Sequence, residues 1–384
     1  MNYIKKTKSG GASRKNSPVH PVNPVKKSAE LVSLLLAWFK ANARDLPWRR
    51  TRDPYAVWVS EIMLQQTQVK TVIPFWSRWM QELPTIEAAA KVNPAKLHKL
   101  WEGLGYYTRV RNLQKAAQAI VTDHNGKFPV NYEAVLALPG IGRYTAGAIC
   151  SIAFNQPTPI LDGNVIRVLT RLFGIAENPK EKKTNAHLWQ LAEELVRHSS
   201  PIAHHSSLSC SQLNQSLMEL GALICTPRNP QCLLCPVQKL CVAFKTGRTK
   251  QLPNLGKRAV ATARHFLAFV IERDGKFLVR QRPEKVVNAH LWEFPSHETT
   301  GAPADAREIL NSDFGLVVPE PEKVCTIKHS ITCYRITVDA FRFSLKTNPS
   351  KIPGHWKTTA QMQILAFTSA HRKILSTLID RAGR

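Results

Sequence analysis

The first two thirds of the chain carry apolar residues at helical spacing. In residues 31–39 (LVSLLLAWF), leucines and aromatic residues stand at positions i, i+3, i+4, i+7 and i+8, which share one face of a helix. At 53–54 and 93–94, an Asp-Pro and an Asn-Pro pair place a capping side chain before a proline suited to a first helical turn. The pattern predicts an all-α domain of short helices over residues 29–244.

The pattern of the last third changes from helical spacing to alternation. Two apolar runs within residues 265–280 flank an Asp-Gly pair at 274–275, which is a strong signal for a tight hairpin turn. Alternating polar and apolar residues return at 326–338. We therefore expect a smaller α+β domain over residues 263–384, joined to the helices by a linker at 245–262 that contains Pro, Gly and Lys.

The charge of the chain indicates a polyanionic partner. The sequence has 53 Lys and Arg against 27 Asp and Glu, a formal net charge of +26. Residues 220–271 contain eight basic residues and no acidic residue. Such a surface favours nucleic acid through phosphate contacts and the release of counterions. Residues 1–28 contain seven more basic residues without apolar periodicity, so we expect a disordered basic tail there.

Four cysteines without shared spacing, and the lack of long apolar runs, indicate the cellular compartment of the protein. Cys150, Cys210, Cys325 and Cys333 show no shared spacing, and no apolar signal segment opens the chain. We therefore expect a reducing compartment, the cytoplasm with its nucleoid, and a mitochondrial or nuclear location is the alternative. No apolar run approaches the roughly 20 residues that cross a bilayer, so we expect a soluble protein without a membrane partner.

The other four cysteines form the most informative motif. Cys225, Cys232, Cys235 and Cys241 stand in a C-x6-C-x2-C-x5-C array, and thiolates crowded into so short a basic segment indicate a metal centre. Zinc sites usually pair cysteines in two C-x2-C units, and only one such unit is present. The spacing resembles the [4Fe–4S] cluster loop of DNA glycosylases related to endonuclease III, so we expect that cofactor. Zinc, or four cysteines buried as small apolar residues, are the alternatives.

Residues 138–149 (LPGIGRYTAGAI) form a second motif. Gly140 and Gly142 allow a sharp turn between helices and leave backbone amides at the start of the next helix, where the helix dipole also favours a DNA phosphate. For two glycines alone, a simple turn between helices would be the default interpretation. The whole segment, however, resembles the helix-hairpin-helix motif of the same glycosylase superfamily, and it precedes the cysteine array as it does there.

Asp162 precedes an amphipathic helical segment within residues 159–174 (PILDGNVIRVLTRLFG). Its ordinary role would be a helix N-cap. In the superfamily, an aspartate that follows the hairpin stabilises positive charge on the sugar, and Asp162 matches its position. Asn164 resembles a residue that forms hydrogen bonds in the same site.

Tyr144 distinguishes between branches of the superfamily. Enzymes like endonuclease III that also cleave the strand carry a lysine at this place, whose amine attacks the sugar to form a Schiff base, and a phenol cannot do so. The chain instead resembles the MutY family of adenine DNA glycosylases, which hydrolyse the glycosidic bond with water. The resemblance covers nearly the whole chain from residue 29 and is clearest in RDLPWR (44–49), VSEIMLQQTQV (59–69), WEGLGYYTRVRNL (101–113) and NQSLMELGALICTP (214–227).

The MutY resemblance implies an activity and its catalytic residues. Family members remove adenine paired with 8-oxoguanine or guanine in double-stranded DNA. Glu61, which would otherwise be an ordinary surface glutamate, would protonate the purine and then activate the attacking water. Asp162 would stay ionised and stabilise the oxocarbenium-like sugar, with Tyr144 and Asn164 beside it, and a covalent adduct between Asp162 and the sugar is the alternative.

The resemblance also implies how the DNA is held. Adenine must leave the base stack to react, so the enzyme needs residues that fill the space it leaves. Gln66 and Tyr106 match family residues that wedge into the duplex near the opposite base. We expect the protein to act as a monomer. The further residues expected to contact the adenine or the DNA are Arg44, Leu46, Trp48, Arg49, Thr67, Gly140, Gly142 and Glu219.

The C-terminal domain resembles the Nudix-like domain of MutY proteins, most clearly in residues 277–299. Nudix hydrolases hold magnesium with a helix of the form R-E-x-x-E-E-x-G. Here Arg307 and Glu308 are followed by Ile-Leu-Asn-Ser at 309–312, so both metal-binding glutamates are missing. Hydrolysis of nucleotides is therefore not expected.

In the family, the Nudix-like domain recognises 8-oxoguanine through a Phe-Ser-His loop. This loop aligns with residues 331–333 (Ile-Thr-Cys), so Thr332 keeps a hydroxyl and the imidazole is lost. His329 and Ser330 precede it and are further candidates for contact with the lesion. We therefore expect weaker discrimination between 8-oxoguanine and guanine than a histidine would give.

Three functions are weighed on these residues. The first is a monofunctional adenine glycosylase. The second is a strand-cleaving glycosylase for oxidised pyrimidines, which Tyr144 and the C-terminal domain disfavour. The third is an iron-sulfur DNA-binding protein without activity, which Glu61 and Asp162 together disfavour. We adopt the first.

Overall fold

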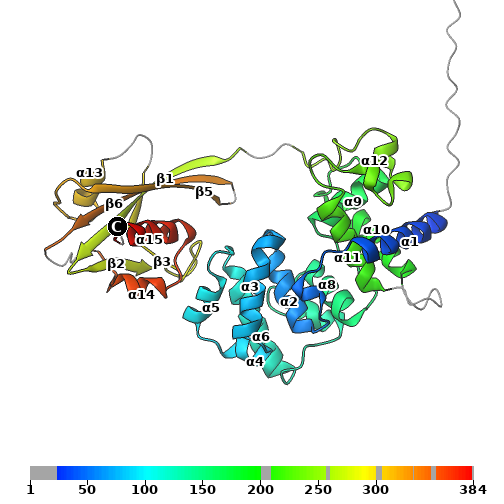
Figure 1. Ribbon diagram of the computed structural model, residues 1–384, viewed down its shortest axis with the longest axis horizontal. Helices are drawn as coiled ribbons and strands as arrows, with labels where there is room; N and C mark the ends of the chain where they lie inside the picture. The colour runs from blue at the N-terminus through cyan, green and yellow to red at the C-terminus, as the bar shows by residue number, and fades with distance from the viewer. Residues whose placement is uncertain are drawn as a thin grey trace, which may run out of the picture.

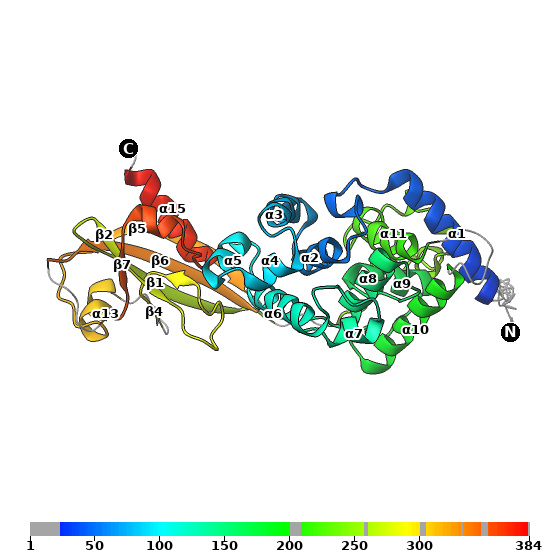
Figure 2. The same ribbon diagram turned by 90° about the horizontal axis from the view of Figure 1, so that it is seen from below.

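A computed structural model describes the chain over residues 24–199, 209–256, 260–299, 305–331, 333–346 and 352–382. A helical domain is followed by a smaller domain built on a mixed sheet (Figures 1 and 2), which confirms the predicted fold class. Helix α1 begins at Pro24, within the predicted basic tail, so the boundary of that tail moves toward the N-terminus. The rest of the predicted tail lies outside the described residues.

The helices begin where the sequence supplies capping residues. Asp53 accepts hydrogen bonds from the backbone N–H groups of Tyr55 and Ala56 and caps α2, and Asn93 caps α5, as predicted. The helices of the domain are α1 (Pro24–Asn42), α2 (Pro54–Leu64), α3 (Val69–Glu82), α4 (Ile86–Lys91), α5 (Pro94–Trp101), α6 (Thr108–Asp123), α7 (Tyr132–Ala137), α8 (Arg143–Phe154), α9 (Gly163–Phe173), α10 (Lys182–His198), α11 (Cys210–Leu223) and α12 (Val242–Lys245), with the 3-10 segments η1 (Pro47–Arg49), η2 (Cys232–Leu234) and η3 (Gln238–Leu240).

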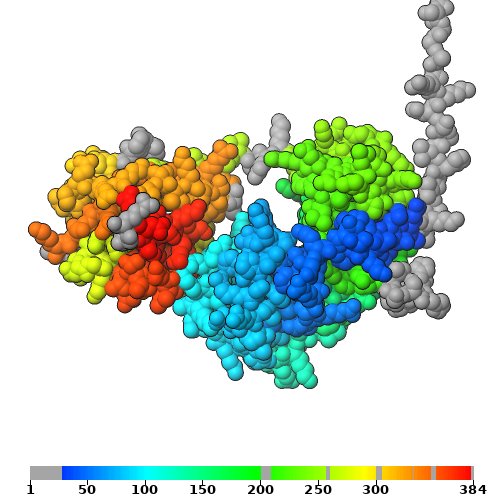
Figure 3. All heavy atoms as spheres, viewed as in Figure 1, coloured from blue at the N-terminus to red at the C-terminus, as the bar shows by residue number. Residues whose placement is uncertain are grey.

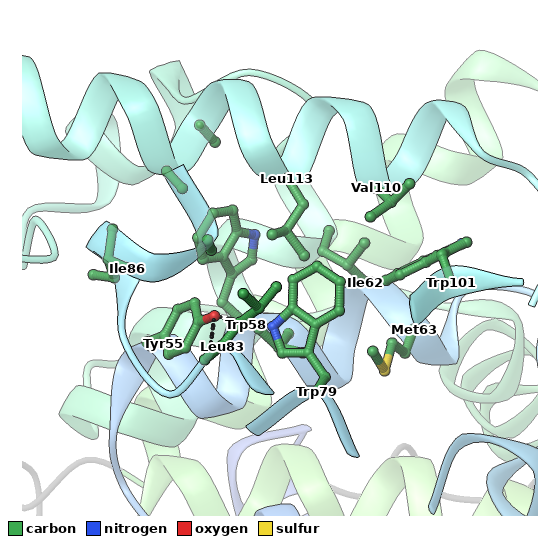
Figure 4. Close-up of a cluster of buried hydrophobic side chains, with 14 of the residues drawn as sticks. Tyr55, Trp58, Ile62, Met63, Trp79, Leu83, Ile86, Trp101, Val110 and Leu113 are labelled. Atoms are coloured by element: carbon green, nitrogen blue, oxygen red, sulfur yellow. Dashed lines mark hydrogen bonds between the residues drawn. The ribbon is translucent and has the colours of Figure 1, made fainter. Parts of the chain in front are cut away.

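Two hydrophobic clusters divide the helical domain into two lobes. The first is centred on Trp58, Trp79 and Trp101 (Figure 4), and the Trp79 indole donates to the Tyr55 hydroxyl, which in turn donates to the Leu83 carbonyl. The second cluster joins α1, α9, α10 and α11. Helix α8 contributes side chains to both clusters. Packing against both clusters therefore fixes the position of α8 between the lobes.

The C-terminal domain is a sheet covered by helices on both faces. Along β1, Leu267, Phe269 and Ile271 face α13, whereas Ala268 and Val270 face α14 and α15, as strand alternation requires. The strand order is β3-β2-β1-β6-β5, with β1 and β6 parallel, while β4 pairs with β1 and β7 with β2. The elements are β1 (Thr262–Arg273), β2 (Lys276–Gln281), β3 (Trp292–Glu293), β4 (Ser296–Thr299), α13 (Ala306–Ser312), β5 (Glu322–Ile331), β6 (Tyr334–Ser344), β7 (His355–Lys357), α14 (Thr359–Gln363) and α15 (Ser369–Ala382).

The predicted hairpin turn between β1 and β2 is confirmed. Arg273 pairs with Lys276, and the two residues between them, Asp274 and Gly275, both have positive φ, as a tight hairpin turn requires. Among the described residues, no helix is long and apolar enough to span a bilayer.

The two domains and the two lobes surround a concave surface. Figure 3 shows the C-terminal domain on one side of a hollow and the region around α9 and α12 on the other, with the helices that follow α2 at its base. This arrangement places both domains around one hollow.

Gly147 of α8 provides a test of the packing between the lobes. A Cβ atom at this position would lie 2.2 Å from the backbone oxygen of Pro159, in the segment that leads to Asp162. We expect Gly147→Ala to lower the free energy of unfolding by about 1–3 kcal/mol, because backbone must shift to admit the methyl group. Gly163→Ala is the matched control, since nothing lies within 4 Å of its added Cβ. Denaturant unfolding that shows equal stability for both variants would contradict this packing.

Candidate active site

A cavity of about 590 Å³ lies between the two lobes. Its walls come from η1, α2, the turn before α8, the first turn of α9 and the middle of α11. A volume of this size is typical of sites for small molecules or single bases. The predicted residues that line it are Arg44, Leu46, Trp48, Arg49, Glu61, Gln66, Thr67, Gly140, Gly142, Tyr144, Asp162, Asn164 and Glu219.

Glu61 is a buried carboxyl group that, among the described contacts, receives one hydrogen bond. It lies on α2 and is only 4 % exposed, although the sequence alone suggested a surface residue. The Tyr144 hydroxyl donates to Glu61 Oε2 over 2.7 Å. Burial raises the pKa of Glu61 to about 7, and the hydrogen bond from Tyr144 opposes that rise only in part. Glu61 can therefore hold a proton near neutral pH.

Asp162 is both a helix cap and a cavity residue. Its Oδ1 accepts from the Val165 backbone N–H over 2.7 Å, and its Oδ2 accepts from Asn164 Nδ2 over 3.0 Å. Burial raises the pKa of Asp162, while these hydrogen bonds and the charge of Arg167 lower it. The N-cap interpretation and the predicted place in the site are thus compatible, because the cap fixes the carboxylate at the cavity wall.

The glycine motif turns the chain into α8. Gly140 has a φ of +76°, and a Cβ atom there would lie 2.5 Å from Asn112 Cβ. Gly142 is the N-cap of α8 and makes no side-chain capping bond, and its added Cβ would meet open space. The first N–H groups of this helix therefore have no capping side chain, an arrangement that suits a phosphate oxygen.

Two predicted wedge residues are held in a left-handed backbone conformation. Gln66 has a φ of +56° and Tyr106 a φ of +48°, which is uncommon for residues with a Cβ atom. Arg109, which the sequence analysis missed, holds both loops. Its guanidinium donates to the backbone oxygen of Gln65 over 2.7 Å and to that of Leu104 over 2.8 Å.

Glu219 forms a buried ion cluster at the far wall of the cavity. Its side chain is fully buried and accepts paired hydrogen bonds from Arg44 and from Arg49, at 2.7–3.1 Å. Burial alone would raise the pKa of Glu219, but the hydrogen bonds from the two guanidinium groups outweigh it and lower the pKa to about 2. Glu219 is therefore ionised, and it holds both arginines at the cavity.

The four predicted metal ligands lie in the loop that follows α11. Cys225, Cys232, Cys235 and Cys241 are half-buried. Among the described residues, no group of three or more side chains is arranged around a single metal ion. Burial raises the pKa of Cys235, and the charges of Cys225, Cys241 and Cys232 raise it further, so the four thiols lie near one another, as the thiolate ligands of one iron-sulfur cluster must.

Two arginines of α9 hold this loop, Arg167 also bonds a residue of the cavity, and the sequence analysis missed both. Arg167 Nε donates to the Cys225 backbone oxygen over 2.7 Å, and its NH2 group donates to Asn164 Oδ1 over 2.8 Å. Arg171 donates to the Thr226 backbone oxygen over 2.7 Å and lies 3.4 Å from Cys225 Sγ. Both arginines bond mainly to backbone oxygens, and no side-chain pattern in the sequence marks such partners.

A second cavity, of about 660 Å³, lies between the domains. Tyr106 lines it from the helical domain, and His329 and Ser330 line it from β5. Burial lowers the pKa of His329, and the charge of Lys373 lowers it further. The structure brings the predicted wedge residue together with two of the predicted lesion-reading residues. Thr332, the third, lies outside the described residues.

The Glu219 cluster gives a prediction for stability. Because its pKa is lowered, ionised Glu219 contributes stability that is fully present above about pH 4.5 and is lost as the pH falls toward 2. We expect Glu219→Gln to lower the free energy of unfolding at pH 7 by about 3–5 kcal/mol, since two arginines lose a buried partner. Asp45→Asn, at an exposed carboxylate paired with Arg50, is the control and should have no measurable effect. Denaturant unfolding at pH 7 and pH 4 checks both variants. If the difference in the free energy of unfolding between the natural protein and Glu219→Gln did not narrow at pH 4, the lowered pKa of Glu219 would be contradicted.

Comparison with known proteins identifies three segments of the chain. Residues 59–194 match the HhH-GPD superfamily of base excision DNA repair proteins, residues 225–241 match the iron-sulfur binding domain of endonuclease III, and residues 267–377 match the NUDIX domain. A solved thermostable thymine-DNA glycosylase superposes with a TM-score of 0.51 and 32% identity, covering 58% of this chain and 98% of that one. The iron-sulfur match confirms the predicted [4Fe–4S] cofactor.

Relatives cover nearly the whole chain. The adenine DNA glycosylase of Rattus norvegicus is 34% identical over 93% of this chain and 80% of its own length. That of Homo sapiens is 34% identical over 88% of this chain and 72% of its own, and that of Arabidopsis thaliana is 41% identical over 68% and 46%. The protein is a DNA glycosylase, and it belongs to the family of adenine DNA glycosylases.

Proposed function

We propose that the protein hydrolyses the N-glycosidic bond of adenine paired with 8-oxoguanine or guanine in duplex DNA, without cleaving the strand. The contact between Tyr144 and Glu61 carries the proposal, because it puts a phenol and a protonated carboxyl group where a strand-cleaving enzyme needs an amine. None of the described residues that line the cavity is a lysine.

Glu61 acts as the general acid. Adenine is a poor leaving group until one of its ring nitrogens is protonated, and a carboxyl group with a pKa of about 7 can supply that proton at neutral pH. When the bond between the base and the sugar breaks, both bonding electrons leave with the base, and the sugar becomes an oxocarbenium-like cation. Glu61, now ionised, then accepts a proton from the water that adds to the sugar.

Asp162 stabilises that cation. Its two oxygens accept hydrogen bonds from Val165 and Asn164, which favour the ionised form and hold it in one position. A fixed negative charge at the cavity wall lowers the energy of a transition state in which positive charge develops on the sugar. The two carboxyl groups thus take different roles because they receive different hydrogen bonds.

Gln66 and Tyr106 fill the space that the flipped adenine leaves. Gln66 is at the rim of the catalytic cavity, and Tyr106, which is 45% exposed, lines the cavity between the domains. Preformed left-handed backbone at both residues means that neither loop must be ordered when the duplex is opened.

The C-terminal domain reads the base opposite adenine rather than hydrolysing nucleotides. In α13, the positions of the missing glutamates belong to a helix whose Ile309 and Leu310 are buried against the sheet. The cavity beside His329 and Ser330 is the place where the opposite base would meet this domain.

The catalytic pair is tested by substitution and by pH. We expect Glu61→Gln and Asp162→Asn each to abolish excision while leaving binding to the mispaired duplex largely intact, because both act on charge that develops in the transition state. Since protonated Glu61 is the active form, kcat/KM should fall about tenfold per unit above about pH 7, and it should fall again at acid pH where Asp162 takes up a proton. Excision assays by alkali cleavage of the product across pH 5–9 measure both effects. Near-normal turnover of Asp162→Asn would leave that residue with a capping role alone.

The altered loop is tested by restoring the histidine. An imidazole that bonds the lesion contributes about 0.5–1.5 kcal/mol, or roughly three- to tenfold in rate. We therefore expect Cys333→His to widen the ratio of single-turnover excision opposite 8-oxoguanine to that opposite guanine by this factor. Cys333 is exposed and follows β5, whereas His329 and Ser330 line the cavity. An unchanged or smaller ratio would shift lesion reading to His329 or Ser330.

A further inference from the structure

The C-terminal domain packs directly on the helical domain beside α5. Leu291 and Ala366 belong to the same hydrophobic cluster as Trp101, and the rings of His98 and His290 stack with centroids 6.3 Å apart. Apolar and stacking contacts of this kind tolerate sliding, because they depend little on direction. Directional hydrogen bonds are what fix the position of one domain on the other.

Glu102 supplies those directional contacts. It is the C-cap of α5, and its side chain is 11% exposed. Its Oε1 accepts from the Phe367 backbone N–H over 2.8 Å, across the domain boundary. Its Oε2 pairs with Lys99 Nζ over 2.6 Å, and the same ammonium group donates to the Leu365 backbone oxygen over 3.1 Å. Arg372 Nε lies 3.9 Å from Oε2, so groups of both domains converge on one carboxylate.

The backbone between Glu102 and Tyr106 is short and rigid. Tyr106 lies four positions further along the chain, and the backbone between them is fixed by its own hydrogen bonds. The Trp101 indole donates to the Gly105 oxygen over 3.1 Å, and Arg109 donates to the oxygens of Leu104 and Gly105. A displacement of Glu102 is therefore passed on to Tyr106.

The segment that Glu102 holds leads into the wall of the cavity between the domains. Phe367 is followed by Thr368, Ser369, Ala370 and His371, and these four residues line that cavity together with Tyr106. One carboxylate thus bonds the residue that directly precedes the wall on the C-terminal side, and it lies next to the loop that carries Tyr106 on the other side.

We propose that Glu102 is a positioning residue that sets the separation between Tyr106 and the lesion-reading face of the C-terminal domain. The inference rests on the proposed function, in which Tyr106 and this face meet the base opposite adenine. Glu102 lies outside the catalytic cavity, so it governs discrimination between 8-oxoguanine and guanine and leaves the chemical step alone.

The test uses the full-length protein with three variants. Glu102→Ala removes the acceptor for the Phe367 N–H and the partner of Lys99, whereas Glu102→Gln keeps the acceptor and loses the charge. Glu82→Gln is the matched control, because Glu82 also pairs with a lysine of α5, Lys96, over 2.8 Å, without an ion pair or hydrogen bond to the C-terminal domain among the described contacts. Hydrogen exchange without DNA follows residues 365–368 and 104–107, and single-turnover excision follows adenine opposite 8-oxoguanine and opposite guanine.

We expect Glu102→Ala to accelerate exchange in both segments and to narrow the 8-oxoguanine to guanine ratio by about three- to tenfold. The rate opposite guanine should stay within about twofold of the natural protein, because catalytic groups are untouched. Glu102→Gln should give exchange rates and an excision ratio between those of Glu102→Ala and the natural protein. Glu82→Gln should give the values of the natural protein. Faster exchange at 365–368 alone, or an unchanged ratio, would overturn the coupling. Equal rates of the natural protein on the two duplexes would instead refute the proposed lesion preference, and the exchange of residues 104–107 would then decide the coupling by itself.

Discussion

Helix α9 is the element on which the active site depends. Its N-cap is Asp162, and one and two turns later its arginines hold the loop of the cluster cysteines. The cap fixes the carboxylate because Asp162 Oδ1 accepts the backbone N–H of Val165 in the first turn of its own helix. Arg167 also bonds Asn164, so the carboxylate, its amide partner and the first cysteine are held by consecutive turns of one rigid helix. A [4Fe–4S] cluster bound at this loop therefore supports the geometry of the cavity as well as the fold.

Three carboxyl groups line the catalytic cavity, and burial together with the hydrogen-bond donors determines their charge. Glu61 receives one hydrogen bond from a phenol and keeps a high pKa, while Glu219 receives two guanidinium groups and is ionised at any physiological pH. Burial raises the pKa of Asp162, and its hydrogen bonds from Val165 and Asn164 and the charge of Arg167 oppose that rise. The cavity thus places a carboxyl group that can hold a proton near neutral pH together with a carboxylate held in place by fixed donors.

Much of the fold could be predicted from the sequence because its signals are local. Helical spacing, the Asp53 and Asn93 caps and the turn at Asp274 each depend on a few neighbouring residues. The partnership of Glu61 and Asp162 is different, since the two lie far apart in the chain and only family resemblance indicated that they share a site. Periodicity gives no such information.

The residues that sequence reasoning missed share one property. Arg109 and Arg167 bond mainly to backbone oxygens, and Glu102 bonds a backbone N–H group. Every residue offers such backbone groups, so no pattern of side chains marks the partner. The altered Phe-Ser-His loop was visible in the sequence, but its effect depends on which side chains reach the cavity. His329 and Ser330 do so.

The guanidinium of Arg109 has a kinetic consequence for the search along DNA. It ties together two loops whose tips, Gln66 and Tyr106, are already in their strained conformation before any duplex is present. If these two side chains enter the base stack, the backbone that carries them does not rearrange. An intact base pair then excludes them, whereas a weakened pair opens and admits them. The rate at which the protein tests each base pair would then be limited by the opening of the duplex rather than by rearrangement of the protein. Flexible loops at these positions would bend away from a mispair instead of opening it.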